Sequence, residues 1–208
     1  SADGFVMKFS SEGQHLWSTY VGAGGVEKIN SVAVDASGDI LIAGRSTQGG
    51  WLNGGFNTSF TGVQDVFLAR ISADGQTLQW GAFLAEAGEW ATGQDIATDV
   101  AVDSNGDVWI TGETTSENWA SGGFDITYGG GTDAFVAKVS GDGQQLRWSS
   151  YLGGDAADRG YGIVTDAFGT AWVTGQTGSA NWTSGGMDTE LGGTSDAFLE
   201  RATRWPSV

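Results

Sequence analysis

The amino-acid sequence predicts an all-β fold assembled from antiparallel repeats. Short runs of β-branched and aromatic residues, such as residues 135–139, are bounded by Gly and Asp along the whole chain. One landmark, an Asp that opens such a run, recurs at four places separated by 62, 68 and 63 residues: Asp3, Asp65, Asp133 and Asp196. Apolar residues never follow helical spacing, which excludes a solenoid of helical hairpins.

Two kinds of hairpin alternate within each repeat. The first ends at a recurring Trp (Trp17, Trp80, Trp148), and the second turns after a recurring Asp (Asp35, Asp103, Asp166). The expected hairpins are residues 3–21, 30–45, 65–84, 97–112, 133–152 and 161–175, followed by a last strand at 196–202. Four strands in a period of this length are typical of a propeller blade. The sequence therefore predicts a β-propeller of four-stranded antiparallel blades.

The number of predicted strands falls short of a closed ring. Residues 1–208 form a single partial propeller domain, with repeats at about 3–64, 65–132 and 133–195 and a partial one at 196–208. This is about three blade equivalents, whereas closed propellers need roughly four to eight blades. We expect a homo-oligomer, a dimer of six blades in which residues 161–175 accept the partner's 3–21 hairpin. The tail 196–208 is then displaced or placed elsewhere. The alternative is that the remaining blades belong to a larger protein.

Composition excludes several classes of partner. The formal net charge of −16 argues against binding to nucleic acid or to anionic membranes. It reflects either simple solubility or a concentrated acidic face for Ca²⁺ or a cationic partner. The chain has no Cys, so it has no disulfide or Cys-based metal site, and no apolar run approaches the roughly 20 residues of a membrane helix. It opens on SADGF, directly in a strand, as expected of a mature or excised boundary rather than a signal peptide.

The connections between the predicted strands divide into short turns and long loops. In an up-and-down blade with strands A to D, the B–C connections (46–64, 113–132, 176–195) and the D–A connections (22–29, 85–96, 153–160) emerge on one face. Long loops in a compact domain usually carry function. We therefore expect binding through this long-loop face.

A Trp recurs in each long B–C loop and provides the main candidate for ligand binding. Trp51, Trp119 and Trp182 align, whereas Trp90 in a D–A loop has no counterpart. Either the aligned rings fold back onto the blade edges, or they present a ring of faces to a sugar or an aromatic ligand. On the second interpretation, the ligand-binding residues are Trp51, Trp90, Trp119, Trp182, Asn118 and Asn181.

Catalysis has little support in the sequence. The only histidine, His15, lies in a predicted turn, so neither a Ser-His-Asp triad nor a multi-His metal set can be built. Acids in and beside the second D–A loop are either a glycoside-hydrolysing pair or solvated charges: Glu86, Glu89, Asp95 and Asp99. We expect no enzyme activity.

Calcium is the one inorganic ligand that the sequence suggests. Asp155 and Asp158 offer oxygen ligands beside Gly-rich backbone on the long-loop face. A second acidic stretch, residues 103–107, lacks the later Glu of an EF-hand loop and is more simply an Asn-Gly hairpin turn.

The combined landmarks resemble a known repeat family. Residues 133–154, DAFVAKVSGDGQQLRWSSYLGG, are followed by Val173-Thr174-Gly175 and by an Asn-Trp loop. This pattern covers nearly the whole chain and resembles the bacterial SBBP (seven-bladed β-propeller) repeat. The resemblance implies a propeller in exported or cell-surface bacterial proteins, often within longer chains, and no common catalytic residues.

The expected function is a non-catalytic interaction or structural module that binds through the long-loop face and assembles by sharing strands. The alternative from another class is a carbohydrate-binding or carbohydrate-active propeller. A third interpretation is a spacer or an assembly unit of a filament or surface layer.

Overall fold

The computed structural model describes residues 1–84 and 93–202, and over these residues it contains strands and no helices. No helix in this part of the chain is therefore long and apolar enough to cross a membrane. The strands are β1 (Gly4–Phe9), β2 (His15–Val21), β3 (Glu27–Val34), β4 (Ile40–Ser46), β5 (Asp65–Ile71), β6 (Leu78–Leu84), β7 (Asp95–Val102), β8 (Val108–Thr114), β9 (Asp133–Val139), β10 (Leu146–Leu152), β11 (Asp158–Thr165), β12 (Ala171–Thr177) and β13 (Asp196–Ala202).

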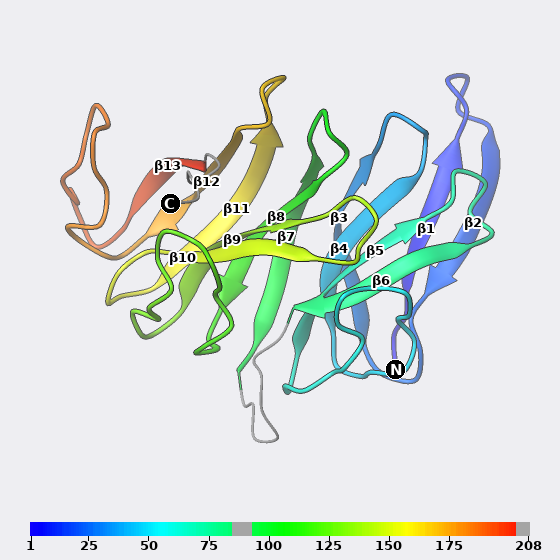
Figure 1. Cartoon of the computed structure of the whole chain (residues 1–208), viewed down its shortest axis with the longest axis horizontal. Helices are drawn as coiled ribbons and strands as arrows, with labels where there is room; N and C mark the ends of the chain where they lie inside the picture. Colours follow the sequence, from blue (N-terminus) through cyan, green and yellow to red (C-terminus); the bar gives the residue numbers. More distant parts are fainter. Residues whose placement is uncertain (85–92, 203–208) are drawn as a thin grey trace.

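These strands form four separate antiparallel sheets. A two-stranded sheet (β1-β2) is followed by two four-stranded sheets (β3-β4-β5-β6 and β7-β8-β9-β10) and by a three-stranded sheet (β11-β12-β13). The sheets lie side by side in an open row, with the β1–β2 hairpin at one end and β11–β13 at the other (Figure 1). The predicted all-β architecture of four-stranded propeller blades is confirmed, and the row is not closed.

Each sheet occupies one blade, which we number 0 to 3 along the chain. Strands β3, β7 and β11 hold position A, and β7 contacts both of the others. Hydrogen-bonded pairing joins the start of strand A to the end of B and the start of C, as in Asp95–Thr114–Asp133. The B–C and D–A connections consequently emerge at the same end of the blades. Within the described residues, blade 0 holds positions C and D only, and blade 3 holds positions A, B and C.

The A strands begin earlier than the sequence pattern indicates. Blade 1 begins at Glu27 rather than at residue 30, and blade 3 at Asp158 rather than at residue 161. Each A strand contains a register shift, as between Gly160 and Gly162. This bulge breaks the alternation of apolar and polar residues, and it hides the first residues of the strand from a period-two pattern.

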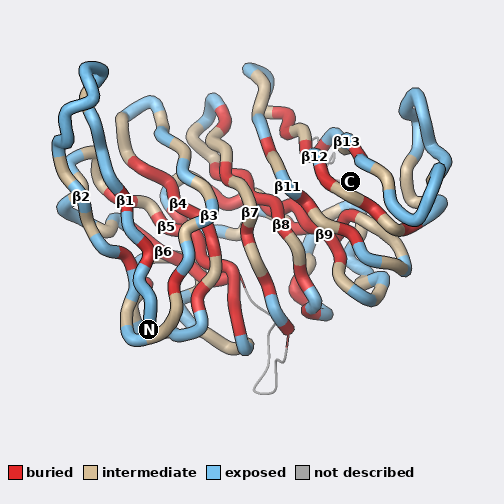
Figure 2. The backbone as a smooth tube through the Cα atoms, turned by 180° about the vertical axis from the view of Figure 1, so that it is seen from behind, coloured by how far each residue is buried: buried red, intermediate tan, exposed pale blue. Residues whose placement is uncertain are grey.

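The hydrophobic core consists of layers between neighbouring blades. One layer packs Leu41 and Leu68 of blade 1 against Ile110 and Phe135 of blade 2. Similar layers join blade 0 to blade 1 and blade 2 to blade 3. Buried residues concentrate in the middle sheets, whereas the residues of β1 and β2 are mostly exposed (Figure 2).

Candidate binding site

The first residue of each A strand is a buried acid that lies at the long-loop end of the blade. In blade 3, Asp158 is fully buried and accepts hydrogen bonds from the Thr177 hydroxyl, from the Ser179 hydroxyl at 2.7 Å and from the Gly154 amide at 2.9 Å. Asp95 accepts from Thr114 and Ser116 in the same way, and Glu27 accepts from Ser46. The repetition of this contact in every A strand gives Asp158 a structural role at the junction of three segments.

The second predicted calcium ligand, Asp155, is exposed to solvent. Within residues 1–84 and 93–202, no three His, Asp or Glu side chains are grouped so as to hold a metal ion. Both oxygens of Asp158 accept hydrogen bonds from protein donors.

The Trp rings of the B–C loops pack against the blades. Trp119 is 9% exposed, stacks edge-on against Phe135 at 5.0 Å between centroids, and donates from Nε1 to the Thr114 hydroxyl at 3.1 Å. Trp51 stacks on Phe67 at 5.1 Å, and Trp182 on Phe198 at 5.1 Å, with a bond from Trp182 Nε1 to Thr177. This geometry favours the interpretation in which the rings fold back onto the blade edges. Trp90 lies outside the described residues, as do Glu86 and Glu89.

The two candidate Asn residues have a backbone role. Asn118 and Asn181 adopt positive φ angles of 61° and 64°, and Gly50 adopts 86° at the same position of the first loop. The left-handed region favours Gly and Asn over other residues. This conformation accounts for the Asn that precedes Trp119 and Trp182 without a ligand.

The remaining candidate acid of the described residues joins three blades. Asp99 on β7 accepts a hydrogen bond from Ser31 of β3 at 2.6 Å and another from the Ile163 amide of β11 at 2.8 Å. His15 is exposed and packs edge-on to Phe9. Neither arrangement resembles a pair of catalytic carboxylates.

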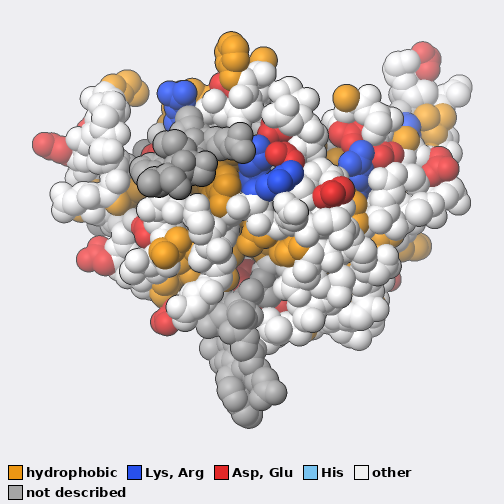
Figure 3. All heavy atoms as spheres, viewed as in Figure 1, with side chains coloured by type: hydrophobic (Ala, Val, Ile, Leu, Met, Phe, Trp, Pro, Cys, Tyr) orange, Lys and Arg blue, Asp and Glu red, His pale blue; other side chains and the backbone are white. Residues whose placement is uncertain are grey.

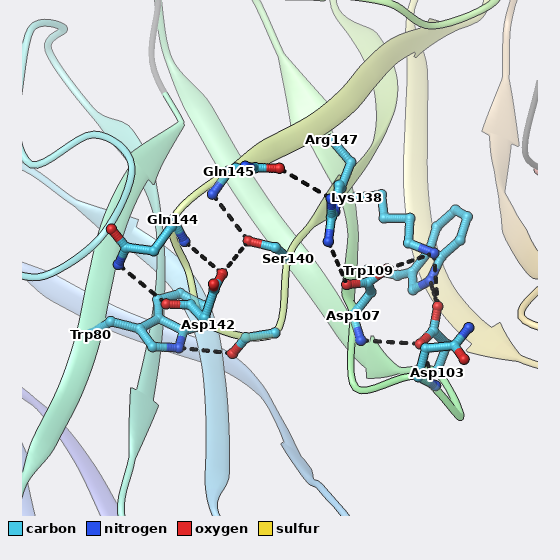
Figure 4. A network of polar contacts seen from close by, with 12 residues as sticks. Trp80, Asp103, Asp107, Trp109, Lys138, Ser140, Asp142, Gln144, Gln145 and Arg147 are labelled. Atoms are coloured by element: carbon cyan, nitrogen blue, oxygen red, sulfur yellow. Dashed lines mark hydrogen bonds and ion pairs between the residues drawn. The ribbon is translucent and has the colours of Figure 1, made fainter. Parts of the chain in front are cut away.

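In blades 1 and 2 a basic side chain from strand C forms salt bridges with the acidic A–B turn. In blade 2, Lys138 Nζ lies 2.8 Å from Asp103 and 3.1 Å from Asp107, and 4.7 Å above the ring of Trp109 (Figure 4). Arg70 takes the same place in blade 1 with Asp35 and Asp39. Basic groups therefore lie against acidic ones in the middle of the face shown in Figure 3. The stretch 103–107 is a hairpin turn closed by Lys138.

A cavity lies in blade 3, where the described residues supply no fourth strand. It has a volume of about 770 Å³ and lies between β13 and the B–C loop, residues 178–195. Ser184, Gly186, Asp188 and Leu191 line its loop side, and Phe198 lines its strand side. These loop residues were not among the predicted site residues. The repeated Gly-Gly pair after each Trp was the signal that marked this loop segment.

Comparison with known proteins agrees with this architecture. A search of the curated proteins finds no match to the chain. Residues 87–118 match the SBBP family, described as a beta-propeller repeat, and the described part of this stretch contains β7 and β8. Over residues 87–118 the resemblance predicted from the sequence is confirmed, because this stretch is similar to the SBBP beta-propeller repeat.

Proposed function

We propose that this chain is a non-catalytic β-propeller module of an exported or cell-surface bacterial protein, which associates with other polypeptides through its open ends and binds through its long-loop face. One observation supports this proposal above all others. Apolar side chains are exposed at both ends of the row, at positions that are buried between blades inside it. Phe5 is 63% exposed, whereas Phe67 and Phe135, at the same position of later blades, are 0% exposed.

The two open ends are complementary in the same sense as two neighbouring blades. The first end carries apolar residues on β1, β2 and β3, and the last end carries them on β11 and β13. They are Phe5, Met7, Phe9, Tyr20, Val32 and Val34 at the first end, and Val164 and Leu199 at the last. Contiguous exposed apolar surface of this kind marks an interaction site, because its burial is favourable by about 25 cal/mol per Å². Strand sharing between two copies would complete six blades. In the alternative, further blades of a larger protein would cover the same surfaces.

The acids on the long-loop face support a role in binding rather than catalysis. The carboxylate oxygens of Asp158 and Asp65 accept hydrogen bonds from neighbouring loop residues. They hold the loops in place, and the loop tips between them remain available for a partner.

Sedimentation over a range of chain concentrations tests the proposal, together with amide hydrogen exchange of β1, β2 and β13. We expect the mass to rise with concentration while exchange slows in these end strands. A constant monomer mass with end strands already protected at the lowest concentration would contradict the proposal. A glycan array run on the same sample tests the carbohydrate-binding alternative, which requires binding of a sugar.

A further inference from the structure

In the complete blades, strand D lies in a slot between strand C and the preceding B–C loop. One edge of β6 pairs with β5, and its other side is held by the loop, because the Gly81 amide donates to Asn53 O at 2.7 Å and the Phe83 amide to Asn57 O at 2.8 Å. In blade 2 the loop acceptors Ser121 and Asp125 bind the amides of β10 in the same way, at 2.8 and 2.9 Å.

Blade 3 has this loop, but residues 1–84 and 93–202 supply no strand D for it. Its equivalent acceptor positions, Ser184 and Asp188, line the 770 Å³ cavity beside the free edge of β13. Gly185 has a φ of 71°, close to the 70° of Gly54 and the 68° of Gly122. At Gly185 the loop of blade 3 therefore keeps the positive φ found in the loops that hold a fourth strand.

Gly186 occupies the position at which strand D approaches the loop most closely in the complete blades. A Cβ at Gly55 would lie 2.4 Å from Gly81 O, and one at Gly123 would lie 2.3 Å from Ser149 O, so strand D requires glycine at both positions. At Gly186 the nearest atom would be 3.7 Å away and belongs to its own loop. Glycine at this position is required only when a strand lies in the cavity.

We propose that the cavity is an acceptor slot for a fourth antiparallel strand, and that its occupant is β2 of a second copy of this chain. The inference rests on the proposed function, whose assembly it makes specific. In complete blades an aromatic residue of strand D packs on the loop, as Phe83 does on Phe60 and Tyr151 on Tyr128. The residue of β2 at this position is Tyr20, which is 82% exposed.

The β1–β2 hairpin enters as a unit, so β1 replaces β13 on β12. Phe5 then takes the place of Phe198 beside Trp182, and Met7 takes the place of Glu200. In complete blades that place belongs to Ala69 and Ala137, which are fully buried. Glu200 is a half-buried acid whose pKa is raised by burial, so β13 is a poorer strand C than β1.

The turn of the same hairpin gives an independent indication. In later blades the glycine of the C–D turn lies against a Trp of the preceding blade: Gly75 on Trp17 and Gly143 on Trp80. Gly13 occupies this position in the β1–β2 turn and has no neighbour within 4 Å. The Trp of blade 2 that would meet it in the assembly is Trp148, which is equivalent to Trp17 and Trp80.

A cross-linking experiment tests the slot directly, since the chain has no cysteine. Two single variants, Tyr20→Cys and Leu191→Cys, are mixed and treated with a short bifunctional thiol reagent. Leu191 occupies the loop position of Phe60 and Tyr128, so the two thiols meet only when β2 lies in the slot of the other chain. The control pairs Leu191→Cys with Leu16→Cys, because Leu16 is exposed near the other end of β2, roughly 13 Å along the strand from Tyr20.

Blocking variants provide the second measurement. Gly186→Val fills the slot, whereas Gly193→Val places the same side chain in open space elsewhere on the loop. We expect Gly186→Val and Tyr20→Ser each to weaken self-association roughly tenfold or more, and Gly193→Val to leave it unchanged. Unfolding curves of the monomers confirm that the fold is retained.

The outcomes separate the slot from the assembly as a whole. The proposal is supported if Tyr20→Cys, but not Leu16→Cys, cross-links to Leu191→Cys. The cross-link should also be lost when Gly186→Val is added to the Leu191→Cys chain. Self-association without the 20/191 cross-link overturns the slot and leaves the proposed assembly standing. A chain that stays monomeric at all concentrations overturns both. A monomer that binds a synthetic peptide of residues 144–153, the β10 sequence, shows that the slot takes a strand and overturns the second copy as its source.

Discussion

The ring of Trp119 lies edge-on to that of Phe135, 5.0 Å away and perpendicular to it, while its indole nitrogen bonds to Thr114. Trp119 therefore ties the long B–C loop to strands B and C of its own blade. We expect Trp119→Ala to lower the free energy of unfolding by about 3–5 kcal/mol, the usual cost of truncating a buried aromatic residue. Urea unfolding measures this loss.

The matched control for that substitution is Trp172→Ala. Trp172 is half-buried on the open face of blade 3 and contacts Arg201 at 5.7 Å. Its truncation in the monomer should cost about 1 kcal/mol. A loss at Trp119 no larger than at Trp172 would show that the loop is not anchored by its Trp.

Close contact between a glycine turn and a Trp of the preceding blade predicts a second effect. Gly143 has a φ of 71°, and a Cβ there would lie 2.2 Å from the Trp80 ring. Gly143→Ala should lower the free energy of unfolding by about 2–4 kcal/mol, because strain at positive φ adds to overpacking. Gly106→Ala, at a φ of 82° with no neighbour within 4 Å, isolates the backbone strain at about 1 kcal/mol. An equal loss in the free energy of unfolding for both variants would mean that the Trp80 ring moves aside without cost.

The Asp133 carboxyl predicts a specific dependence of stability on pH. It is 1% exposed, its Oδ2 accepts from the Gly129 amide at 2.8 Å, and its Oδ1 has no hydrogen-bond partner. Burial raises its pKa from 3.8 to about 7. Because the folded chain holds this proton more tightly than the unfolded chain, the stabilising contribution is complete below pH 3.8 and is lost as pH rises to about 7.

Asp133→Asn should remove this dependence. The stability of the variant relative to the wild type should rise by up to about 1.4 kcal/mol for each pH unit across that window and stay level above it. Urea unfolding at a series of pH values measures the difference. Asp3→Asn, at the exposed equivalent position in blade 0, serves as the control. A stability difference between Asp133→Asn and the wild type that does not change with pH would show that the pKa of Asp133 is not raised by folding.

The repeat landmarks were sufficient to predict the blades, because each strand pairs with its neighbour in the chain. The strand bounds of β13 agree with the predicted residues 196–202, whereas the A strands were shortened because a bulge interrupts their alternation. The roles of the loop residues required coordinates. Asn118 follows the sequence pattern of a ligand, but its left-handed φ is a property of the backbone. The packing of Trp119 likewise depends on Phe135, which its position in the sequence does not reveal.

The slot in blade 3 shows where the sequence alone was least informative. The prediction counted the missing strand but did not identify the groups that would receive it. The loop residues that hold strand D in blades 1 and 2 accept through their carbonyl oxygens, and a main-chain acceptor has no signature in the side chain. The glycine at position 186 was visible, but its purpose follows only from the close approach of a strand to Gly55 and Gly123.

Lys138 supports the last prediction, because it is the counter-charge of a buried acid. The Asp103 side chain is 0% exposed, and it accepts hydrogen bonds from Lys138 and from Trp109. Burial alone would raise the pKa of Asp103, but these two bonds outweigh it and hold the pKa below 3.8. Lys138→Met should lower the free energy of unfolding at pH 7 by about 3–5 kcal/mol, since it leaves a buried charge uncompensated.

The pH dependence of that loss distinguishes the ion pair from simple packing. A lowered pKa stabilises the folded chain above the ordinary value of 3.8, and this stability disappears as pH falls through the folded value. The gap between Lys138→Met and the wild type should therefore be widest near pH 7 and narrow below pH 3.8, where Asp103 takes up a proton. Lys28→Met, at an exposed lysine, should change stability by no more than about 0.5 kcal/mol at any pH. A gap for Lys138→Met that is the same at low and neutral pH would assign its cost to lost contact with Trp109 instead.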